Sequence, residues 1–241
     1  MKSLANQFAD LGPWITSFVV NGQVYGGGYD AENDGRFPEF RKRYPQPSRV
    51  LELGCLEGGH TIPLARRADH VVAIDSRVDN IKKAEFVRNL YDLHNITFIT
   101  ADLETYPLES LGVFDVVFNV GLLYHLPEPW KLLEQIAPLT KHMFLWTHIA
   151  PAKWWYSNRG GYKGMIYAEG GVPDPLSGMS QTSFWPTEKE LIRMLDNSGF
   201  ANVDVIDVDT SHKHGPAILL ACDSRVTASA ELAGVAGGIG R

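Results

Sequence analysis

The feature that most limits the fold is an alternation, from Arg49 onward, of short apolar runs with amphipathic stretches. Apolar runs of this length are typical of buried strands, whereas the stretches between them have helical spacing. The runs occupy residues 49–54, 70–75, 96–102, 114–121 and 142–149. Such an alternation predicts βαβ units around a parallel sheet.

The C-terminal part of the chain departs from this alternation. A helix is predicted over 187–200, with Thr187 as its N-cap and Gly199 near its end. The apolar runs 202–209 and 216–223 then follow each other with no room for a helix between them. We therefore expect an α/β, Rossmann-like, seven-stranded, mostly parallel sheet with helices on both faces and an antiparallel C-terminal strand pair.

Two regions fall outside the pattern and suggest how the chain is organised. Residues 1–48, rich in glycine and aromatic residues, are expected to form an N-terminal lid segment on a main domain of residues 49–223. Residues 150–186 are an aromatic-rich insertion after strand five, on the side of the sheet where substrate is expected. Residues 224–241 are rich in small side chains and predict a disordered tail.

Composition excludes several classes of protein. The net charge of −6 argues against nucleic acid as a partner, because phosphate contacts require clustered Lys and Arg. No apolar run approaches the roughly 18 residues of a membrane span, and no secretory signal is visible, so a cytoplasmic protein is expected. Cys55 and Cys222 form no metal-like or redox-like pair, which favours reduced, buried thiols. The oligomeric state cannot be deduced.

The turn after the first predicted strand, in "VLELGCLEGGH" at residues 50–60, looks like a nucleotide-binding loop that lacks its middle glycine. Gly54 is followed by Cys55 and Leu56 where a G-x-G pattern would place a second glycine. In dinucleotide-binding proteins that glycine allows close approach of a pyrophosphate, which Leu56 would obstruct. Leu56 therefore argues against NAD or FAD, although a nicotinamide-dependent oxidoreductase remains an alternative.

Four segments together resemble the class I S-adenosylmethionine-dependent methyltransferases. They are "ELGCLEG" at 52–58, the acidic strand end at Asp75, "TADLE" at 100–104 and "FNVGLLYHL" at 118–126. The resemblance covers roughly residues 48–222, so that the main domain would be a methyltransferase domain with S-adenosylmethionine as its cofactor.

The resemblance implies a set of cofactor-binding residues. Asp75, which lies 21 residues after Gly54, would accept hydrogen bonds from the ribose hydroxyls; as an alternative, it would be a helix N-cap. Asp102 and Leu103 would meet the adenine edge, unless they form only a surface turn. We expect Leu56 to have an ordinary backbone conformation and to pack beside the methionine part of the cofactor, since leucine resists positive φ. The full predicted set is Glu52, Gly54, Leu56, Gly58, Asp75, Ser76, Asp102, Leu103 and Asn119.

Two histidines follow the ends of neighbouring strands and are candidates for acid–base catalysis. Tyr124 and His125 come just after strand four, and His148 ends strand five. A histidine base suits a hydroxyl or amine acceptor in methyl transfer. The alternative for His125 and His148 is a packing or capping role. No HExxH or paired-carboxylate spacing indicates a metal site.

The insertion carries the candidates for acceptor binding. Trp155, Tyr156 and Trp185 would wall an apolar or planar pocket, and Arg159 would hold an anionic group; alternatively, the aromatic residues only pack the insertion onto the sheet. Within the superfamily the chain most resembles the tRNA wobble-uridine methyl- and carboxymethyltransferases and their small-molecule relatives. Leu126 and Pro127 stand where arginines follow the LYH element in the tRNA enzymes, and this departure, with the negative net charge, argues against a tRNA substrate. We expect a small-molecule acceptor methylated at oxygen, with a tRNA-modifying methyl- or carboxymethyltransferase as the alternative.

Overall fold

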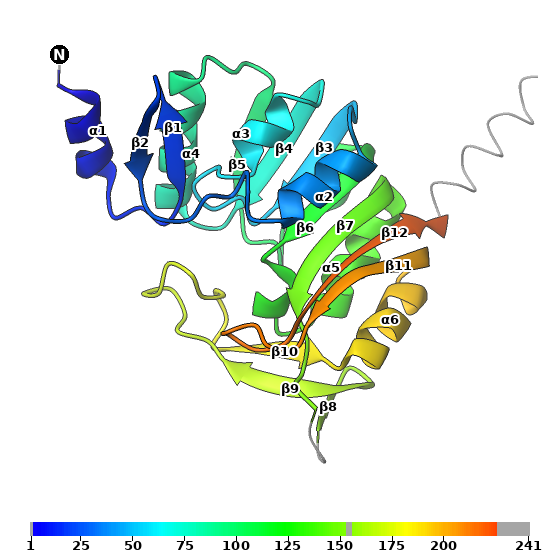
Figure 1. Ribbon diagram of the computed structural model, residues 1–241. Helices are drawn as coiled ribbons and strands as arrows, with labels where there is room; N and C mark the ends of the chain where they lie inside the picture. The colour runs from blue at the N-terminus through cyan, green and yellow to red at the C-terminus, as the bar shows by residue number, and fades with distance from the viewer. Residues whose placement is uncertain (1, 153–155, 226–241) are drawn as a thin grey trace, which may run out of the picture. The chain divides into compact units, whose positions relative to one another are not determined.

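The computed structural model describes residues 2–152 and 156–225, which divide into two compact units, one up to Ala101 and one from Asp102 onward (Figure 1). One seven-stranded sheet is present, with the strand order β11-β12-β7-β6-β3-β4-β5. Its strands are β3 (Arg49–Leu53), β4 (His70–Asp75), β5 (Ile96–Thr100), β6 (Phe114–Val120), β7 (Thr140–His148), β11 (Phe200–Asp209) and β12 (Ala217–Ser224).

The strand directions confirm the predicted sheet. Strands β3, β4 and β5 pair in parallel in the first unit, as do β6 and β7 in the second. The last strand, β12, runs antiparallel to both β7 and β11. Side chains of β3, β4 and β6 are almost all buried, which explains their continuous apolar sequences, since interior parallel strands are covered on both faces.

Helices connect the parallel strands as the sequence pattern predicts. They are α3 (Thr61–Ala65), α4 (Val78–Leu90) and α5 (Pro129–Ile136), with α6 (Glu188–Asn197) leading into β11. The backbone N–H of Glu190 donates to the Thr187 hydroxyl at 3.2 Å, which confirms Thr187 as the N-cap of α6. No helix in the described part of the chain is long and apolar enough to span a bilayer.

The N-terminal segment of the first unit has its own elements. These are α1 (Leu4–Leu11), the hairpin of β1 (Ser17–Val20) and β2 (Gln23–Gly26), and α2 (Arg36–Arg43). The Phe8 ring packs edge-on against Phe86 of α4, with 5.2 Å between centroids. Gly27 allows close chain approach, because a Cβ there would lie 2.2 Å from the Ile15 carbonyl oxygen. The segment is thus packed against the helix that follows β4.

The insertion in the second unit forms a separate antiparallel sheet, which the sequence pattern did not predict. Its strands are β8 (Ser157–Arg159), β9 (Tyr162–Ala168) and β10 (Thr182–Pro186), in the order β10-β9-β8 (Figure 1). The backbone N–H of Phe184 on β10 donates to the carbonyl of Leu126 at 2.9 Å. The insertion therefore contacts the segment that follows β6.

Two smaller predictions are also resolved. Cys55 and Cys222 are both free and buried, as expected. The tail was predicted to begin at residue 224, but Ser224 still pairs with Phe200 in the sheet. The Ser224 hydroxyl also donates to the Ala137 carbonyl at 2.5 Å. Residues 226–241 of the predicted tail lie outside the described residues.

Candidate active site

The loop after β3 is held against the end of β4. The backbone N–H groups of Gly54 and Cys55 both donate to the Ile74 carbonyl, at 2.9 and 3.0 Å. Gly54 and Gly58 have φ angles of +75° and +85°, which glycine adopts without steric cost. The loop thus turns sharply and then leads into the short helix α3.

The expectation of an ordinary backbone at Leu56 is wrong. Leu56 has a φ angle of +50°, in the left-handed region that leucine resists. In this conformation its backbone N–H donates to Oδ2 of Asp75 at 2.9 Å. The half-buried leucine is held in an unfavourable conformation by a hydrogen bond that links the ends of β3 and β4.

Asp75 is buried, and its carboxylate has several donors. Besides Leu56, the backbone N–H of Arg77 and the side-chain amide of Asn80 donate to Oδ1, at 2.9 and 3.0 Å. Burial raises the pKa of Asp75, and these three donors oppose that effect. Helix α4 begins at Val78 with Arg77 as its N-cap, so Asp75 is not the cap. A carboxylate has about four acceptor positions, which leaves capacity for a further donor.

Glu52 is the second buried carboxyl of this region. It is only 2% exposed, and the Thr61 hydroxyl donates to its Oε2 at 2.5 Å. Burial raises the pKa of Glu52 to about 8, so the group is mostly protonated at neutral pH. In this state the Glu52 carboxyl can donate one hydrogen bond as well as accept.

Glu57 ties the N-terminal segment to the same loop, a role that the sequence did not indicate. Its buried carboxylate accepts from the backbone N–H of Ile15 at 2.9 Å and of Thr16 at 2.8 Å. Lys83 of α4 forms an ion pair with it at 2.8 Å. The N-terminal segment is therefore fixed beside the loop that follows β3.

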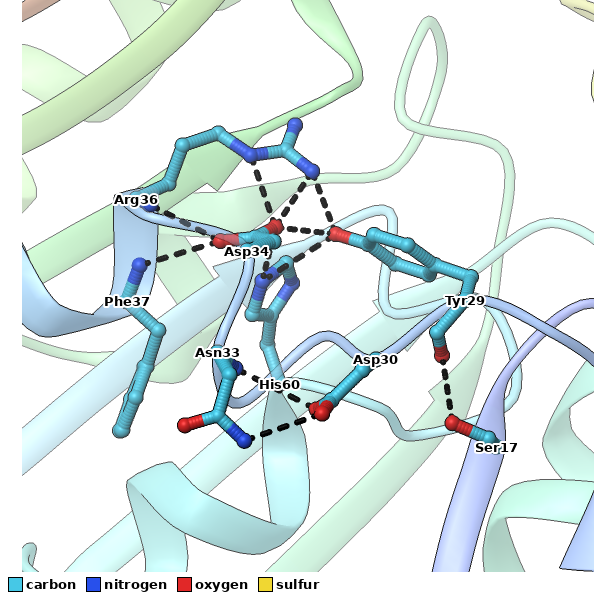
Figure 2. A network of polar contacts seen from close by, with 8 residues as sticks. All are labelled: Ser17, Tyr29, Asp30, Asn33, Asp34, Arg36, Phe37 and His60. Carbon is cyan, nitrogen blue, oxygen red and sulfur yellow. Dashed lines mark hydrogen bonds and ion pairs between the residues drawn. The ribbon is translucent and has the colours of Figure 1, made fainter.

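A polar network extends this attachment to α3, as Figure 2 shows. Tyr29, Arg36 and His60 converge on the carboxylate of Asp34. The Arg36 Nε donates to Asp34 at 2.8 Å, and His60 Nε2 lies 3.3 Å from it. Burial alone would raise the pKa of Asp34, but His60, Arg36 and Tyr29 hold it well below its usual range. Burial lowers the pKa of His60, so its ring is neutral at pH 7.

In the second unit, the turn after β5 uses its own aspartate. The Asp102 carboxylate accepts from the backbone N–H of Glu104 at 3.0 Å. The backbone carbonyl of Asp102 accepts from the backbone N–H of Tyr106 at 2.9 Å. Leu103 is buried, whereas Asp102 is exposed. The predicted turn at Asp102 is therefore present, and the hydrogen bond to Glu104 leaves acceptor capacity on the carboxylate.

Asn119 near the end of β6 has an unusual environment. Its side chain is fully buried, and within the described residues neither its amide nitrogen nor its amide oxygen has a hydrogen-bond partner. Buried amides are almost always hydrogen-bonded in folded proteins. An unpaired donor and acceptor at this position fit a bound ligand with polar groups, as a nucleoside cofactor has.

The three predicted catalytic residues lie together in the second unit. The Tyr124 ring is 4.1 Å from the His125 ring and 4.6 Å from the His148 ring, measured between centroids. Tyr124 and His125 lie in the short 3-10 helix Leu123–His125, and His148 ends the neighbouring strand β7. The carboxyl ends of adjacent parallel strands thus bring these side chains into one cluster.

His148 is buried among aromatic rings. Its ring stacks on Trp185, with 4.7 Å between centroids, and its Nδ1 lies 3.0 Å from the Gly215 carbonyl oxygen. Because a carbonyl only accepts, Nδ1 carries the proton and Nε2 is left as the acceptor. Burial lowers the pKa of His148 to about 4, so the ring is neutral at physiological pH.

His125 is paired instead with a carboxylate that the sequence analysis did not single out. Its Nδ1 lies 3.1 Å from Oε2 and 3.2 Å from Oε1 of Glu169, which follows β9. The two residues are 44 positions apart, and no local pattern connects them. Only the path of the insertion brings Glu169 to His125.

The predicted acceptor-binding residues that the structure describes each have a protein partner. The Trp185 ring stacks with the rings of His148 and Tyr167, at 4.7 and 4.6 Å between centroids, and its indole N–H donates to the Tyr124 carbonyl at 2.8 Å. The structure thus gives Trp185 a packing role beneath the catalytic cluster. Arg159 donates to the Thr182 hydroxyl at 3.4 Å on the small sheet. The Tyr156 hydroxyl donates to the Pro151 carbonyl at 3.3 Å, and Trp155 lies outside the described residues.

The sequence showed no spacing typical of a metal site. In residues 2–152 and 156–225, no group of three or more His, Cys, Asp or Glu side chains is arranged to hold a metal ion. His125 and His148 instead contact a carboxylate and a backbone carbonyl through Nδ1.

Comparison with known proteins assigns the chain to a family. Residues 50–142 match the family described as "Methyltransferase domain". The crystal structure of the N-terminal domain of EvdMO1 with SAH bound is 30% identical, with a TM-score of 0.81, over 92% of this chain and 95% of that chain. The magnesium protoporphyrin IX methyltransferase of Synechocystis, solved with bound SAM, shares the fold at 19% identity and a TM-score of 0.53, over 77% of this chain and 74% of that one.

Curated relatives are more distant. The tRNA U34 carboxymethyltransferase of Alteromonas mediterranea is 28% identical over 171 residues, which are 66% of this chain and 47% of that protein. The ubiquinone biosynthesis O-methyltransferase of Xylella fastidiosa is 31% identical over 112 residues, 46% of this chain and 45% of the relative. The chain thus spans about half the length of these curated relatives.

These findings replace the nicotinamide alternative and agree with the order of motifs along β3, β4, β5 and β6. The cofactor is S-adenosylmethionine, since the related EvdMO1 domain holds its demethylated product. The chain belongs to the S-adenosylmethionine-dependent methyltransferases.

Proposed function

We propose that the enzyme transfers the methyl group to an oxygen atom of a small-molecule acceptor. The observation that supports this proposal is the cluster of Tyr124, His125 and His148, in which both imidazoles have Nδ1 engaged by a fixed oxygen. Such rings present Nε2 as a proton acceptor. A hydroxyl needs a base of this kind, because it loses its proton as the new carbon–oxygen bond forms.

Residues of both units are proposed to contact the cofactor. The cofactor supplies, when bound, a methyl group on a positively charged sulfur. In the first unit, Glu52, Asp75 and the loop from Gly54 to Gly58, together with Ser76, are the proposed cofactor contacts. In the second unit these are Asp102, Leu103 and the unpaired amide of Asn119.

Proton removal is the role of the histidine cluster. The Nε2 of His125 or His148 takes the acceptor's proton, while the oxygen on Nδ1 keeps the ring in one orientation. The aromatic rings of Tyr124, Trp146 and Trp185 surround His148, and they exclude water from the base. Exclusion of water also protects an activated hydroxyl from competing proton transfer.

Two features favour a small molecule over tRNA. The net charge of −6 gives the chain no general attraction for a polyanion. The EvdMO1 N-terminal domain has also been solved in the presence of SAH and D-fucose, and a sugar offers hydroxyl groups as its polar atoms.

The two free, buried cysteines agree with the proposed cytoplasmic location, where thiols stay reduced.

The test is a screen of metabolite fractions with methyl-labelled S-adenosylmethionine. Label is expected in a small product as a methyl ether or ester, identified by mass spectrometry and by the 13C shift of an O-methyl group. Label on nitrogen, carbon or sulfur would overturn the proposed acceptor atom. Label recovered in tRNA, with binding that falls steeply as salt rises, would instead support the tRNA alternative.

Cofactor binding is tested separately by calorimetry on Asp75→Asn. The variant keeps side-chain size but lacks the negative charge, so the affinity for S-adenosylmethionine should fall by at least about tenfold, or 1.4 kcal/mol. Asp79→Asn on the exposed first turn of α4 is the matched control and should bind as the wild type does. Unchanged binding by Asp75→Asn would contradict the assignment of Asp75.

A further inference from the structure

We propose that Glu169 is the positioning residue that makes His125, rather than His148, the base of the reaction. This inference rests on the proposed function, which leaves the choice between the two histidines open. It assigns a role to a residue of the insertion, outside residues 50–142, which match the methyltransferase family. The structural basis is the hydrogen-bonded pair of Glu169 and His125.

The carboxylate of Glu169 is held rigidly. Its side chain is only 2% exposed, and its Oε2 accepts from the Ser177 hydroxyl at 2.6 Å and from the Gly178 backbone N–H at 2.8 Å. These donors come from the loop between β9 and β10, which folds back on Glu169. His125 Nδ1 is a further partner, so the carboxylate cannot rotate away without breaking these contacts.

The charge state of Glu169 determines the tautomer of His125. Burial alone would raise the pKa of Glu169, but the hydrogen bonds from His125, Ser177 and Gly178 lower it to about 2. The carboxylate is therefore ionised throughout the physiological range and can only accept hydrogen bonds. Nδ1 of His125 must then carry a proton, and Nε2 is the ring nitrogen left for the acceptor.

The two histidines differ in what faces Nδ1. The partner of His148 is a neutral carbonyl, and burial already lowers the pKa of His148 to about 4. His125 faces an anion, which compensates the positive charge that the ring gains when it accepts a proton. Of the two rings in the cluster, His125 is therefore the one built to become charged during the reaction.

The backbone at Gly178 also lies very close to His125. A Cβ on Gly178 would lie 2.5 Å from the carbonyl oxygen and 3.2 Å from the Cβ of His125. The loop that holds Glu169 can approach His125 only because residue 178 has no side chain. The Leu126 carbonyl, one residue after His125, accepts from Phe184 of β10. The insertion thus contacts the His125 segment through both Gly178 and Phe184.

The first experiment is 15N NMR of uniformly labelled protein without acceptor, with two-bond correlations that distinguish the two ring nitrogens. His125, assigned through His125→Gln, should show a protonated Nδ1 and an unprotonated Nε2 at pH 7.5. In Glu169→Gln this preference should be lost, because a carboxamide can donate as well as accept. A wild-type ring protonated on Nε2, or a tautomer that Glu169→Gln leaves unchanged, would overturn the proposal.

The second experiment is kinetic and uses a double-mutant cycle. Glu169→Gln should lower kcat by about 10²- to 10⁴-fold with little change in KM for S-adenosylmethionine, as expected when a base loses its orienting partner. In the His125→Gln background the same change should cost less than about threefold, because Glu169 acts only through His125. A full additional loss in the double variant would overturn the positioning role.

Controls separate this role from stability and from the proposed function. Glu188→Gln, on the exposed first turn of α6, should retain wild-type kcat and the wild-type His125 tautomer. The NMR measurement needs no acceptor and therefore stands even if the methylated atom is not oxygen. If Glu169→Gln does not fold, the tautomer of wild-type His125 still decides, since a ring protonated on Nε2 contradicts the geometry.

Discussion

The positive φ angle of Leu56 leads to a prediction in which a conservative substitution does more damage than a drastic one. Leucine in the left-handed region costs roughly 1–2 kcal/mol relative to an ordinary conformation, and Leu56 has φ at +50°. A β-branched side chain fits this region still less well. Leu56→Ile, which conserves volume, should therefore lower the free energy of unfolding by about 1–2 kcal/mol.

Leu56→Gly should be nearly neutral because its effects oppose one another. Removal of the side chain relieves roughly 1–2 kcal/mol of backbone strain. Glycine costs about 0.5–1 kcal/mol through greater freedom of the unfolded chain, and loss of a half-buried leucine costs about 1 kcal/mol. We expect a net change within about 1 kcal/mol, and cofactor affinity within about tenfold of the wild type.

The assay is urea unfolding followed by tryptophan fluorescence, without cofactor. Leu53→Ile on strand β3 is the matched control, since Leu53 is fully buried in a strand that tolerates β-branched residues. If Leu56→Ile proves as stable as the wild type and as the Leu53→Ile control, the left-handed conformation of Leu56 is refuted. A loss of several kcal/mol in Leu56→Gly would show that its side chain contributes more than its backbone strain costs.

Three other predictions concern stability. Gly27→Ala should cost about 1–3 kcal/mol, because the new Cβ would lie 2.2 Å from the Ile15 carbonyl oxygen; Gly28→Ala, with open space around it, should be nearly neutral in the same urea assay. Asp34→Asn should lower the free energy of unfolding by about 3 kcal/mol, because it leaves the partly buried Arg36 without its carboxylate. Its control is Asp30→Asn, on the exposed part of the same turn (Figure 2), which should lower the free energy of unfolding by less than about 1 kcal/mol. His148 contributes stability that is lost as pH falls from about 6.5 toward 4, since the unfolded chain binds a proton at His148 that the folded chain, with its pKa of about 4, does not. Glu52, whose pKa burial raises to about 8, acts in the opposite sense, so the quantity to measure in thermal melts is the difference in stability between the wild type and His148→Gln. This difference should shift in favour of the variant as pH falls through that range, and a constant difference would contradict the buried neutral ring.

The sheet was predictable from the sequence because its strands are buried on both faces. A strand such as β6 must be continuously apolar to occupy that position, and the absence of room for a helix before Ala217 could lead only to an antiparallel return. The meeting of Tyr124 and His125 with His148 was predictable for a related reason. Residues at the carboxyl ends of neighbouring parallel strands lie at the same edge of the sheet.

The conformation of Leu56 could not be predicted, because local preference pointed the other way. Leucine avoids positive φ in isolation, whereas in the fold the hydrogen bond from its N–H to Asp75 stabilises that geometry. The polar attachments of the N-terminal segment are similar. Glu57 lies within the segment 52–58 and Asp34 in none of the quoted segments, and for both residues the partners are defined by packing around α3 and α4.

The pairing of Glu169 with His125 shows most clearly where sequence patterns end. Motif order and strand periodicity by themselves determined the family, the sheet and the candidate histidines, since these depend on local spacing and on burial. The partner on each Nδ1 depends instead on contacts between segments 44 positions apart for His125 and 67 for His148. Only the tertiary structure decided which of the two rings faces a carboxylate, because hydrogen bonds across such separations have no period in the sequence.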